Sequence, residues 1–311
     1  NQLNSARNSF ISWDIDMSNV EFIFTDTYSH WTRDHGPQFL IGENHWEVIN
    51  QQFNGYPVEY GCELVENSNN QIEGRPLDNE ARGWEDDDDT NIDFANHLNW
   101  DILDIPVYWT GGNFMTDGYG MGFSTELMVN ENNINESEFK NIIEEYLNID
   151  NYHIFDNPNV ESIQHIDCMA KLVDPETIII KQVSELSPEY ECIEEFADSF
   201  YDLNTFYERP FEIHRIYCPQ IDAPWWEVNP VAAYTNSLIL NSKILVPQYG
   251  IFEDAQALQI YQQAMPGYEV IGFDESAGSP WYGEDALHCR TMSIFDPNML
   301  HISHKYIRNE D

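Results

Sequence analysis

Hydrophobic residues recur along this chain with two different spacings, and each spacing predicts one kind of element. Three segments carry apolar residues at helical intervals, so we expect amphipathic helices over 137–147, from Ser187-Pro188 onward, and over 252–265. The first would be capped by Ser137, and the third would stop at Pro266-Gly267. The expected apolar stripes are Phe139, Ile142, Ile143, Tyr146 and Leu147 in the first helix, and Ile193, Phe196, Ala197 and Phe200 in the second.

Five further segments are typical of β-hairpins, in which a strand is followed by a tight turn and a second strand. Their turns contain the Gly, Asn, Asp and Pro residues that such connections favour. The expected first strands are 36–41, 111–115, 168–173, 237–240 and 291–295, with turns at 42–44, 118–120, 174–175, 241–243 and 296–298. Hairpins recurring with helices between them predict sheet units arranged radially in one domain. Polar residues lie near the start of each first strand, so we expect them to meet in one central site.

The segment between the first and second hairpins is strongly polar. Residues 66–82 are rich in Asn, Glu and Gly, and 85–89 are acidic. We expect a long, solvated surface loop here. Calcium binding is the alternative, because oxygen ligands are plentiful, although their spacing matches no EF-hand loop.

The composition limits the classes of partner. The chain has 311 residues, of which 42% are hydrophobic, and this suffices for one large domain. No apolar run approaches the roughly 20 residues that cross a bilayer, so we expect no membrane insertion. The formal net charge of −42 argues against nucleic acid, which requires clustered Lys and Arg. The charge would attract a cationic substrate, or would be an adaptation of solubility to salty or cold surroundings.

Five cysteines leave at least one thiol unpaired within the chain. They are Cys62, Cys168, Cys192, Cys218 and Cys289. We expect the first four to be small packing residues. Cys289 differs because it belongs to a polar motif, 283–291, close to the end of the chain.

Cys289 combines with two other motifs, 31–37 and 165–168, to supply a thiol, an imidazole and two carboxylates. A guanidinium group is a planar cation, and Asp34 and Asp167 can each accept a pair of its N–H bonds. In a strand, His165 and Asp167 would point to the same face. Cys289 would attack the guanidinium carbon, while His165 would protonate the departing ammonia and then activate water. Neighbouring carboxylates should raise the pKa of the thiol, and we expect the bound cation to offset this effect.

Other interpretations of these residues remain open. His165 and Asp167 would be half of a metal site if His288 or another histidine joined them, although the chain has no His-Glu-x-x-His or Cys-x-x-Cys motif. Trp31 would be either an aromatic wall over the bound cation or a core residue.

Several motifs together resemble the Porphyromonas-type peptidylarginine deiminases. They follow one another in order from about residue 20 to the end, at 31–37, 110–120, 165–168, 234–241, 264–268 and 285–291. This family is grouped with agmatine and arginine deiminases among the guanidine-modifying enzymes. The resemblance implies an α/β fold, the five-bladed α/β propeller or pentein fold with pseudo-fivefold ββαβ repeats.

The resemblance also implies a role for each matching residue. Cys289 would be the nucleophile, His165 the general acid and base, and Asp34 and Asp167 the ligands of the guanidinium group. Asn236 would belong to the catalytic group, and Trp31 and Gly112 to the substrate pocket. The implied reaction needs no cofactor or metal, and it converts arginine in peptides or proteins to citrulline with release of ammonia.

Three features depart from the family. Its bacterial members carry an Arg-Pro-Arg segment that recognises the carboxylate of a C-terminal arginine, whereas 80–86 is expanded and acidic here. Arg75 and Arg82 are candidate substitutes, or simply loop charges. Ser162 replaces an expected aromatic contact with the substrate. The third departure concerns the two ends of the domain. We expect 1–311 to be a single catalytic domain that lacks part of an N-terminal strand and an immunoglobulin-like C-terminal domain.

Alternative functions follow from the same residues. An agmatine or free arginine deiminase would use the same chemistry, but its glycine-rich motifs differ from 162–164 and 285–287. A non-catalytic acidic binding protein on the same fold and a metal-dependent hydrolase are alternatives of other classes. The resemblance implies a secreted or cell-surface protein, and the cytoplasm of a halophile would also suit the acidity.

Overall fold

Four three-stranded sheets form the framework of the protein. The computed structural model describes residues 2–42, 45–56, 62, 84–159, 163–222, 229–274, 281–283 and 285–297. Within these ranges the strands are β1 Gln38–Ile41, β2 Trp46–Gln52, β3 Asp101–Tyr108, β4 Met115–Thr116, β5 Met121–Thr125, β6 Asn151–Phe155, β7 Ala170–Asp174, β8 Thr177–Gln182, β9 Glu212–Tyr217, β10 Leu238–Leu240, β11 Lys243–Gln248 and β12 Glu269–Asp274. The sheets are β1-β2-β3, β4-β5-β6, β7-β8-β9 and β10-β11-β12.

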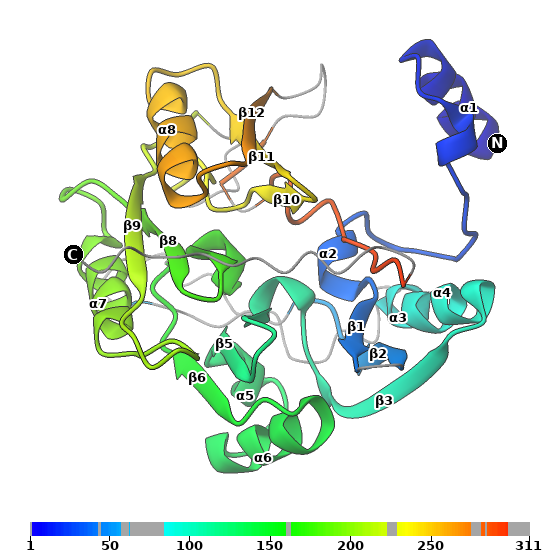
Figure 1. Cartoon of the computed structure of the whole chain (residues 1–311), viewed down its shortest axis with the longest axis horizontal. Helices are drawn as coiled ribbons and strands as arrows, with labels where there is room; N and C mark the ends of the chain where they lie inside the picture. The colour runs from blue at the N-terminus through cyan, green and yellow to red at the C-terminus, as the bar shows by residue number, and fades with distance from the viewer. Residues whose placement is uncertain are drawn as a thin grey trace, which may run out of the picture.

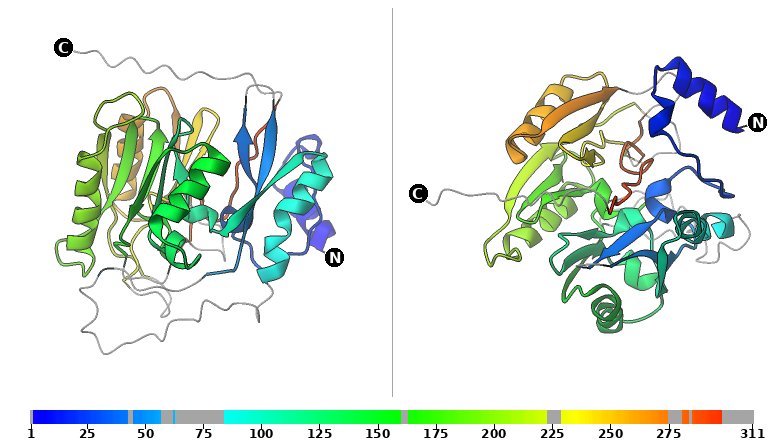
Figure 2. Two further views of the ribbon diagram at one scale, coloured as in Figure 1. Left: turned by 90° about the horizontal axis from the view of Figure 1, so that it is seen from below. Right: turned by 45° about the vertical axis from the view of Figure 1, so that its right-hand side comes forward.

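Each sheet repeats one plan. An antiparallel hairpin comes first, and a helical segment then leads to a third strand that pairs in parallel with the second strand of the hairpin. The helices are α1 Gln2–Ser12, α2 Thr32–His35, α3 Trp84–Asp88, α4 Thr90–Leu98, α5 Leu127–Asn130, α6 Glu136–Leu147, α7 Tyr190–Tyr201 and α8 Asp254–Ala264, with short 3-10 turns η1 Met17–Asn19, η3 Gly111–Asn113 and η4 Ile166–Cys168. Figure 1 shows the four sheets around a common centre, and the strands run along roughly one direction in the side view of Figure 2. The ββαβ repeat predicted for the first four hairpins is confirmed. The first strand expected over 111–115 is wrong for 111–114, because 111–113 form the turn η3 and β4 begins only at Met115.

The fifth predicted hairpin differs from the other four. Residues 291–296 belong to no helix or strand, and the end of the expected turn, Asn298, lies outside the described residues. Phe295 packs against Phe39 and Trp46 of the first sheet, with ring centroids 6.3 and 6.2 Å apart. The prediction of a strand over 291–295 is therefore wrong for the described part of this segment, which is held by aromatic packing.

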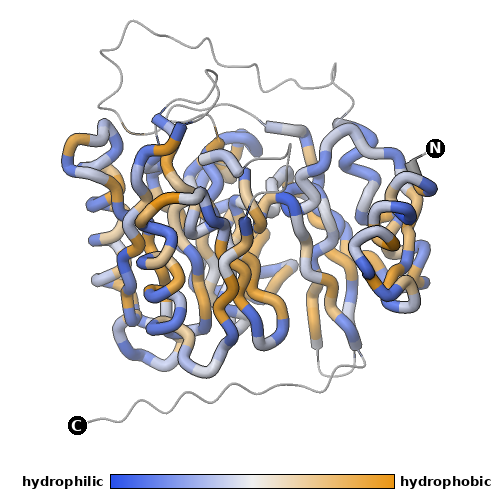
Figure 3. The backbone as a smooth tube through the Cα atoms, turned by 90° about the horizontal axis from the view of Figure 1, so that it is seen from above, coloured by the Kyte–Doolittle hydropathy of each residue, from blue (hydrophilic) through white to orange (hydrophobic). Residues whose placement is uncertain are grey.

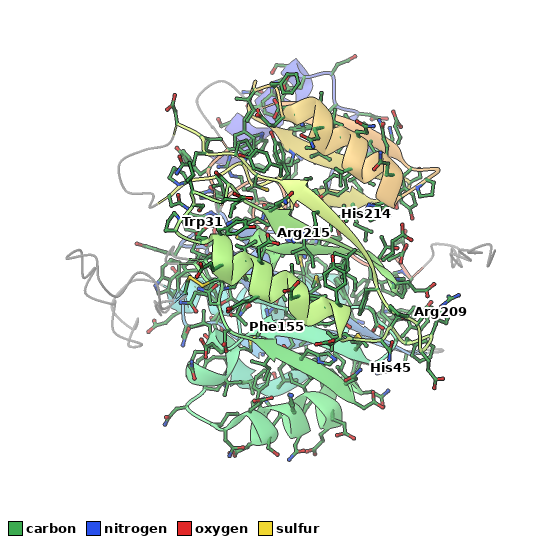
Figure 4. All side chains as sticks on the ribbon, turned by 90° about the vertical axis from the view of Figure 1, so that its left-hand side faces the viewer. Trp31, His45, Phe155, Arg209, His214 and Arg215 are labelled. Carbon is green, nitrogen blue, oxygen red and sulfur yellow. A yellow bond between two sulfur atoms is a disulfide. The ribbon has the colours of Figure 1, made fainter. Side chains whose placement is uncertain are left out.

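Helices α4, α6, α7 and α8 lie on the outer side of the sheets (Figure 1). Phe155 at the end of β6 packs against Phe196 and Phe200 of α7, with ring centroids 5.2 and 4.9 Å apart (Figure 4). The expected apolar stripe of α7 is fully buried, and hydrophobic colour follows the strands in Figure 3. Helix α6 begins one residue earlier than predicted, because the side chain of Asn135 accepts the N–H of Glu138. The three predicted amphipathic helices are confirmed, whereas Ser137 is not the cap.

The acidic segment is not a loop, which corrects the sequence-based expectation. Residues 85–88 lie in α3, whose acidic first turn is favourable at a helix N-terminus. Asp87 is fully buried and accepts the backbone N–H groups of Tyr28 and Ser29. Asp88 likewise accepts the N–H of Phe53. These carboxylates therefore fix neighbouring backbone, while 66–82 lies outside the described residues.

Two of the cysteines expected to be packing residues form a disulfide. Cys62 is bonded to Cys192 of α7, which lies 130 residues later. Cys168 and Cys218 are buried free thiols, as expected. The prediction was wrong for the pair because their contact depends on a long loop closure, which no local pattern reveals.

We expect the Cys192→Ser variant to lose about 2–4 kcal/mol of unfolding free energy, because the cross-link restricts the unfolded chain. Urea denaturation without reductant measures the difference. Wild-type protein with reductant should unfold like the variant. Identical unfolding midpoints for the oxidised wild type and the variant would contradict the assigned role of this bond.

No helix of the described ranges is both long enough and apolar enough to cross a membrane.

Candidate active site

The segments that precede the first strands of the sheets meet at one place. Asp34 lies in α2 before β1, Gly112 in η3 before β4, and Asp167 in η4 before β7. Asn236 precedes β10, and Cys289 lies in the segment 285–297. Figure 1 shows α2 beside this last segment near the centre of the molecule, and the N–H of Arg33 donates to the carbonyl of Cys289 over 3.2 Å. The convergence predicted from the hairpins thus holds for these five residues.

His165 and Asp167 do not lie in a strand, contrary to the prediction. The N–H of Cys168 donates to the carbonyl of His165, and the N–H of Met169 to that of Ile166, so the chain forms a 3-10 turn here. Strand β7 begins only at Ala170. Both side chains are nevertheless buried at the site, because the turn brings them there instead of the period of a strand.

Asp34 is a buried carboxylate with both oxygen atoms engaged. The N–H of Gly112 donates to Oδ1 over 3.1 Å, and the hydroxyl of Tyr56 donates to Oδ2 over 2.7 Å. His165 Nδ1 lies 3.5 Å from Oδ1. Burial raises the pKa of Asp34 to about 7, although the bonds from Tyr56 and Gly112 oppose the rise. A cation that entered the site would favour the ionised carboxylate.

Asp167 is the second buried carboxylate. His288 Nδ1 lies 2.6 Å from its Oδ2, and the amide of Asn236 donates to the same oxygen over 3.4 Å. Burial raises the pKa of Asp167 to about 6, while the neighbouring His165 lowers it and Asp34 adds to the rise. The two carboxylates therefore share one water-poor environment and repel each other, an arrangement that a cation would relieve.

Asn236 connects Asp167 to Cys289. Its Nδ2 donates to Cys289 Sγ over 3.1 Å, and its Oδ1 accepts the N–H groups of His288 and Cys289 over 3.0 and 3.2 Å. The side chain is completely buried, so its orientation is fixed. One amide thus holds both the backbone and the sulfur atom of Cys289.

Burial and charge set the protonation of the thiol and of His165. A hydrogen bond with Cys168 is the largest single influence and lowers the pKa of Cys289, but burial and the carboxylates Asp167 and Asp34 raise it overall. Burial lowers the pKa of His165 to about 4, despite the charge of Asp167. Near neutral pH, the free protein therefore holds a protonated thiol and a neutral imidazole that can accept a proton.

Gly112 lies where three of these polar groups come together. A Cβ atom at this position would lie 2.7 Å from His165 Nδ1, 2.8 Å from Asp34 Oδ1 and 3.2 Å from Asp167 Oδ2. Contacts this short require the neighbouring atoms to move. The absence of a side chain at Gly112 is thus what allows the three polar groups to lie this close to its backbone and to one another.

We expect Gly112→Ala to lower kcat/KM for a guanidine substrate by about 10²-fold, because it displaces His165 and Asp34 from their positions. Gly42→Ala is the matched control, since its Cβ would lie 3.4 Å from the nearest atom, the carbonyl oxygen of His45. Steady-state kinetics of both variants give the comparison. Equal loss in both, or full activity of Gly112→Ala, would remove Gly112 from the site.

Trp31 contacts Tyr56, which in turn lies beside His165 of the site. Their rings are 5.5 Å apart, and the ring of Tyr56 lies 6.0 Å from that of His165. Trp31 is partly exposed, which fits a wall better than a core position. Tyr56 itself was missed by sequence reasoning, because no motif surrounds it.

Arg33 and Lys171 were also missed, and His288 was considered only as a possible metal ligand, although signals for all three existed. Arg33 directly precedes Asp34 and His288 directly precedes Cys289, so both belong to motifs that were already assigned. In the structure, Arg33 Nε donates to the carbonyl of His288 over 3.3 Å. Lys171 follows Asp167 by four positions, in β7. Arg75, Arg82 and Ser162 lie outside the described residues. Among those that the structure does describe, no group of three or more His, Cys, Asp or Glu side chains is arranged to hold a metal ion.

The arrangement suits the binding and attack of a planar cation. Two buried carboxylates and a neutral imidazole that can accept a proton lie around Gly112, and a buried thiol is held by the Asn236 amide, which also contacts Asp167. These are the groups that nucleophilic substitution at a guanidinium carbon requires.

Comparison with known proteins places the chain among deiminases. The model of the Porphyromonas-type peptidyl-arginine deiminase family matches residues 1–294. A Vibrio parahaemolyticus protein with the provisional name agmatine deiminase is 26% identical over 303 residues, covering 90% of this chain and 78% of that protein. A Lactococcus lactis protein with the same provisional name is 28% identical over 204 residues, which are 58% of this chain and only 55% of that protein.

Solved structures show the same fold. The agmatine deiminase of Enterococcus faecalis superimposes with a TM-score of 0.64 at 22% identity, covering 78% of this chain and 69% of that one. A Porphyromonas gingivalis protein described provisionally as an arginine deiminase gives a TM-score of 0.66 at 22% identity, covering 88% of this chain and 76% of that one. This chain therefore shares its α/β fold with these two solved structures.

Proposed function

The chain belongs to the Porphyromonas-type peptidyl-arginine deiminase family, and from this premise we propose that it converts arginine residues of peptides or proteins to citrulline. Membership supports hydrolysis of a guanidino group. The observation that carries the proposal is the meeting of Asp34, Asp167 and His165 around Gly112, with the Cys289 thiol joined to Asp167 through the Asn236 amide. Two carboxylates matched to one cation explain why so many charged groups are buried together.

In the proposed reaction, Asp34 and Asp167 hold the guanidinium group through paired N–H bonds. Tyr56 and His288, which contact these carboxylates in the free protein, would yield their places to the substrate. The arriving positive charge lowers the pKa of the Cys289 thiol, since it offsets the repulsion from both carboxylates. The thiolate therefore forms mainly when substrate is bound, and His165 accepts the proton that the thiol loses.

Two displacement steps follow. The sulfur of Cys289 bonds to the guanidinium carbon, and the bond from that carbon to one terminal nitrogen breaks as His165 returns its proton, so that ammonia leaves. Water then gives one proton to His165 and bonds to the same carbon, and the carbon–sulfur bond breaks as the remaining O–H proton passes to solvent, so that the ureido group of citrulline and the thiolate are released. His165 then returns its proton to the Cys289 thiolate, which restores the free protein. Asn236 keeps the sulfur in place through its amide during both steps.

Two classes of substrate fit the proposed chemistry. The family description supports peptidyl arginine, whereas the provisional names of the relatives favour agmatine as a second candidate. Arg75 and Arg82 are proposed to bind the carboxylate of a C-terminal arginine. Citrulline or the corresponding ureido product should therefore be measured from three matched substrates: a peptide with C-terminal arginine, the same peptide with internal arginine, and agmatine.

We expect turnover of the peptides to exceed that of agmatine, and loss of all turnover in Cys289→Ala. Preference for agmatine would favour the hypothesis of an agmatine deiminase over that of a peptidylarginine deiminase. Absence of turnover in wild-type protein would overturn the enzymatic proposal in favour of a non-catalytic acidic binding protein.

We also propose that the chain completes a five-bladed propeller and acts outside the cell. Packing of Phe295 on the first sheet supports a fifth unit that includes 291–297. The Cys62–Cys192 disulfide supports an oxidising location, such as the cell surface or the exterior. Fractionation of the source cells, with detection of the protein by antibody, tests the location.

A further inference from the structure

Lys171 is a buried cation that the proposed reaction does not yet use. It is the second residue of β7 and only 8% of its surface is exposed. Its ammonium donates to the carbonyl of Ser237 over 2.9 Å. In the described part of the chain this ammonium forms no ion pair with a carboxylate. A buried ammonium bonded only to a neutral carbonyl is costly to desolvate, so nearby negative charge is needed to offset this cost.

Lys181, on the adjacent strand β8, shows what a structural lysine looks like in the same sheet. It is 5% exposed, and its ammonium lies 3.2 Å from Glu189 and 2.9 Å from Asn159. Its charge is therefore neutralised locally, at the start of α7. Burial of a lysine in this sheet therefore does not by itself require a neighbouring catalytic group, because a carboxylate can pair with it. Lys171 has no such ion pair among the described residues, so its burial points to a catalytic neighbour.

The groups that influence Lys171 all belong to the active site. Burial is the largest effect and lowers its pKa to about 7, and the positive Arg33 of α2 adds to this, while Asp167 and Cys289 oppose it. Lys171 in turn helps to keep the imidazole of His288 neutral, since it lowers the pKa of that group after burial and Arg33. Its charge is thus felt by Asp167, Cys289 and His288 together. A positive charge here favours both the carboxylate and the thiolate.

The carbonyl of Ser237, which accepts the hydrogen bond from Lys171, links this lysine to Cys289. Ser237 directly follows Asn236, whose amide holds the sulfur and the backbone of Cys289. Thr235, on the other side, donates through its hydroxyl to the carbonyl of Cys168 over 3.0 Å. The segment 235–237 is therefore anchored to the third sheet unit at both ends, by Lys171 and by Thr235. Movement of the Ser237 carbonyl would move the Asn236 amide with it.

We infer that Lys171 is a positioning residue for Cys289: its ammonium fixes the Asn236–Ser237 segment and is the buried counter-charge of the Cys289 thiolate. The inference rests on the proposed function, since it takes Cys289 to react as a thiolate. It has two separable parts, a hydrogen bond to the Ser237 carbonyl and a positive charge. Substitutions of Lys171 can remove one or both.

The test compares Lys171→Met, Lys171→Gln and Lys171→Arg with the matched control Lys181→Met. The first readout is the rate at which iodoacetamide alkylates Cys289, measured against pH by mass spectrometry of the peptide that contains it. The second is the pH dependence of kcat/KM for an arginyl peptide. Thermal unfolding of each variant separates these effects from loss of stability.

We expect Lys171→Met to shift the apparent pKa of Cys289 upward by about one unit, which makes alkylation near neutral pH about tenfold slower. Lys171→Gln can keep a hydrogen bond without the charge and should show the same shift, while Lys171→Arg should restore the wild-type pH midpoint. Lys181→Met should lose stability without moving it. If Lys171→Met fails to fold, Lys171→Gln carries the test.

An unchanged pH midpoint in Lys171→Gln, or the same shift in Lys181→Met, would overturn the inference. The two proposals fail in different ways. If wild-type protein hydrolyses no guanidine but the alkylation midpoint shifts as expected, the proposed function fails and the counter-charge stands. If wild-type protein turns over arginyl peptide and the Lys171 variants keep its pH profile, only the role of Lys171 fails.

Discussion

Replacing Cys289 by serine should reduce guanidine hydrolysis by at least about 10⁴-fold, with the fold unchanged. The substitution preserves the size of the side chain, but a hydroxyl remains protonated where a thiol can ionise, so the attacking atom is lost. Asn236 can still donate to the new oxygen, which is why we expect little effect on stability. Ammonia release from an arginyl peptide, followed beside the wild type, measures the loss.

Cys218→Ser is the matched control for this variant. Cys218 is also a buried free thiol, 1% exposed, but it belongs to a hydrophobic core cluster with Val173, Ile179 and Val183. Its replacement should lower stability and leave kcat close to that of the wild type. Retention of more than a tenth of the wild-type rate by Cys289→Ser would show that another group attacks the substrate.

Replacing Asp34 by asparagine should lower kcat/KM by about 10³-fold, since breaking a buried ion pair with the substrate removes several kcal/mol of binding. The amide reproduces the shape of the protonated carboxyl and can still accept the N–H of Gly112. The wild type should lose activity in the same manner as the pH falls, because the carboxylate is protonated below its pKa of about 7. This contribution is present above that pH and absent below it.

The pH profile of Asp34→Asn should therefore lack the limb near pH 7. Asp104→Asn is the control of equal charge change, because Asp104 is exposed on β3 and accepts a bond from Asn50 over 2.8 Å. It should keep the wild-type rate and profile. A profile of Asp34→Asn that still shows the limb near pH 7 would assign that limb to another group, such as Asp167.

The sequence predicted the repeating plan because hairpins leave a local record. Turn residues such as Gly42 and Asn241, set between apolar strands, mark where each sheet begins. Residues just before the first strands then had to lie at the same end of each unit. This reasoning predicted one central site, whereas the family resemblance identified Asn236 and Gly112 as members of it.

What the sequence did not reveal depends on contacts between distant segments. Asp87 in the acidic segment binds backbone at Tyr28 and Ser29, far from it along the chain, so its burial left no local pattern. The pairing of Cys62 with Cys192 is likewise a product of the complete fold. Sequence reasoning is therefore strongest where a motif and its turn are adjacent, and weakest where a charge is satisfied by remote backbone.

His165 and Asp167 show a further limit. The period of a strand was used to place both on one face, yet a 3-10 turn does so instead. The predicted neighbourhood was right although the predicted element was wrong. Burial of the two side chains against Asp34 depends on how η4 packs beside η3, and no spacing within 165–168 reports that.

The most direct test of the account is the mass of a covalent intermediate. Wild-type protein quenched in acid during turnover of an arginyl peptide should carry the mass of that peptide less one ammonia, and digestion should place the addition on Cys289. The addition should be absent from Cys289→Ala and from protein quenched before substrate is added. Citrulline formation with the added mass on a residue other than Cys289 would contradict attack by Cys289 on the guanidinium carbon. Citrulline formation at the full rate in Cys289→Ala would contradict it as well.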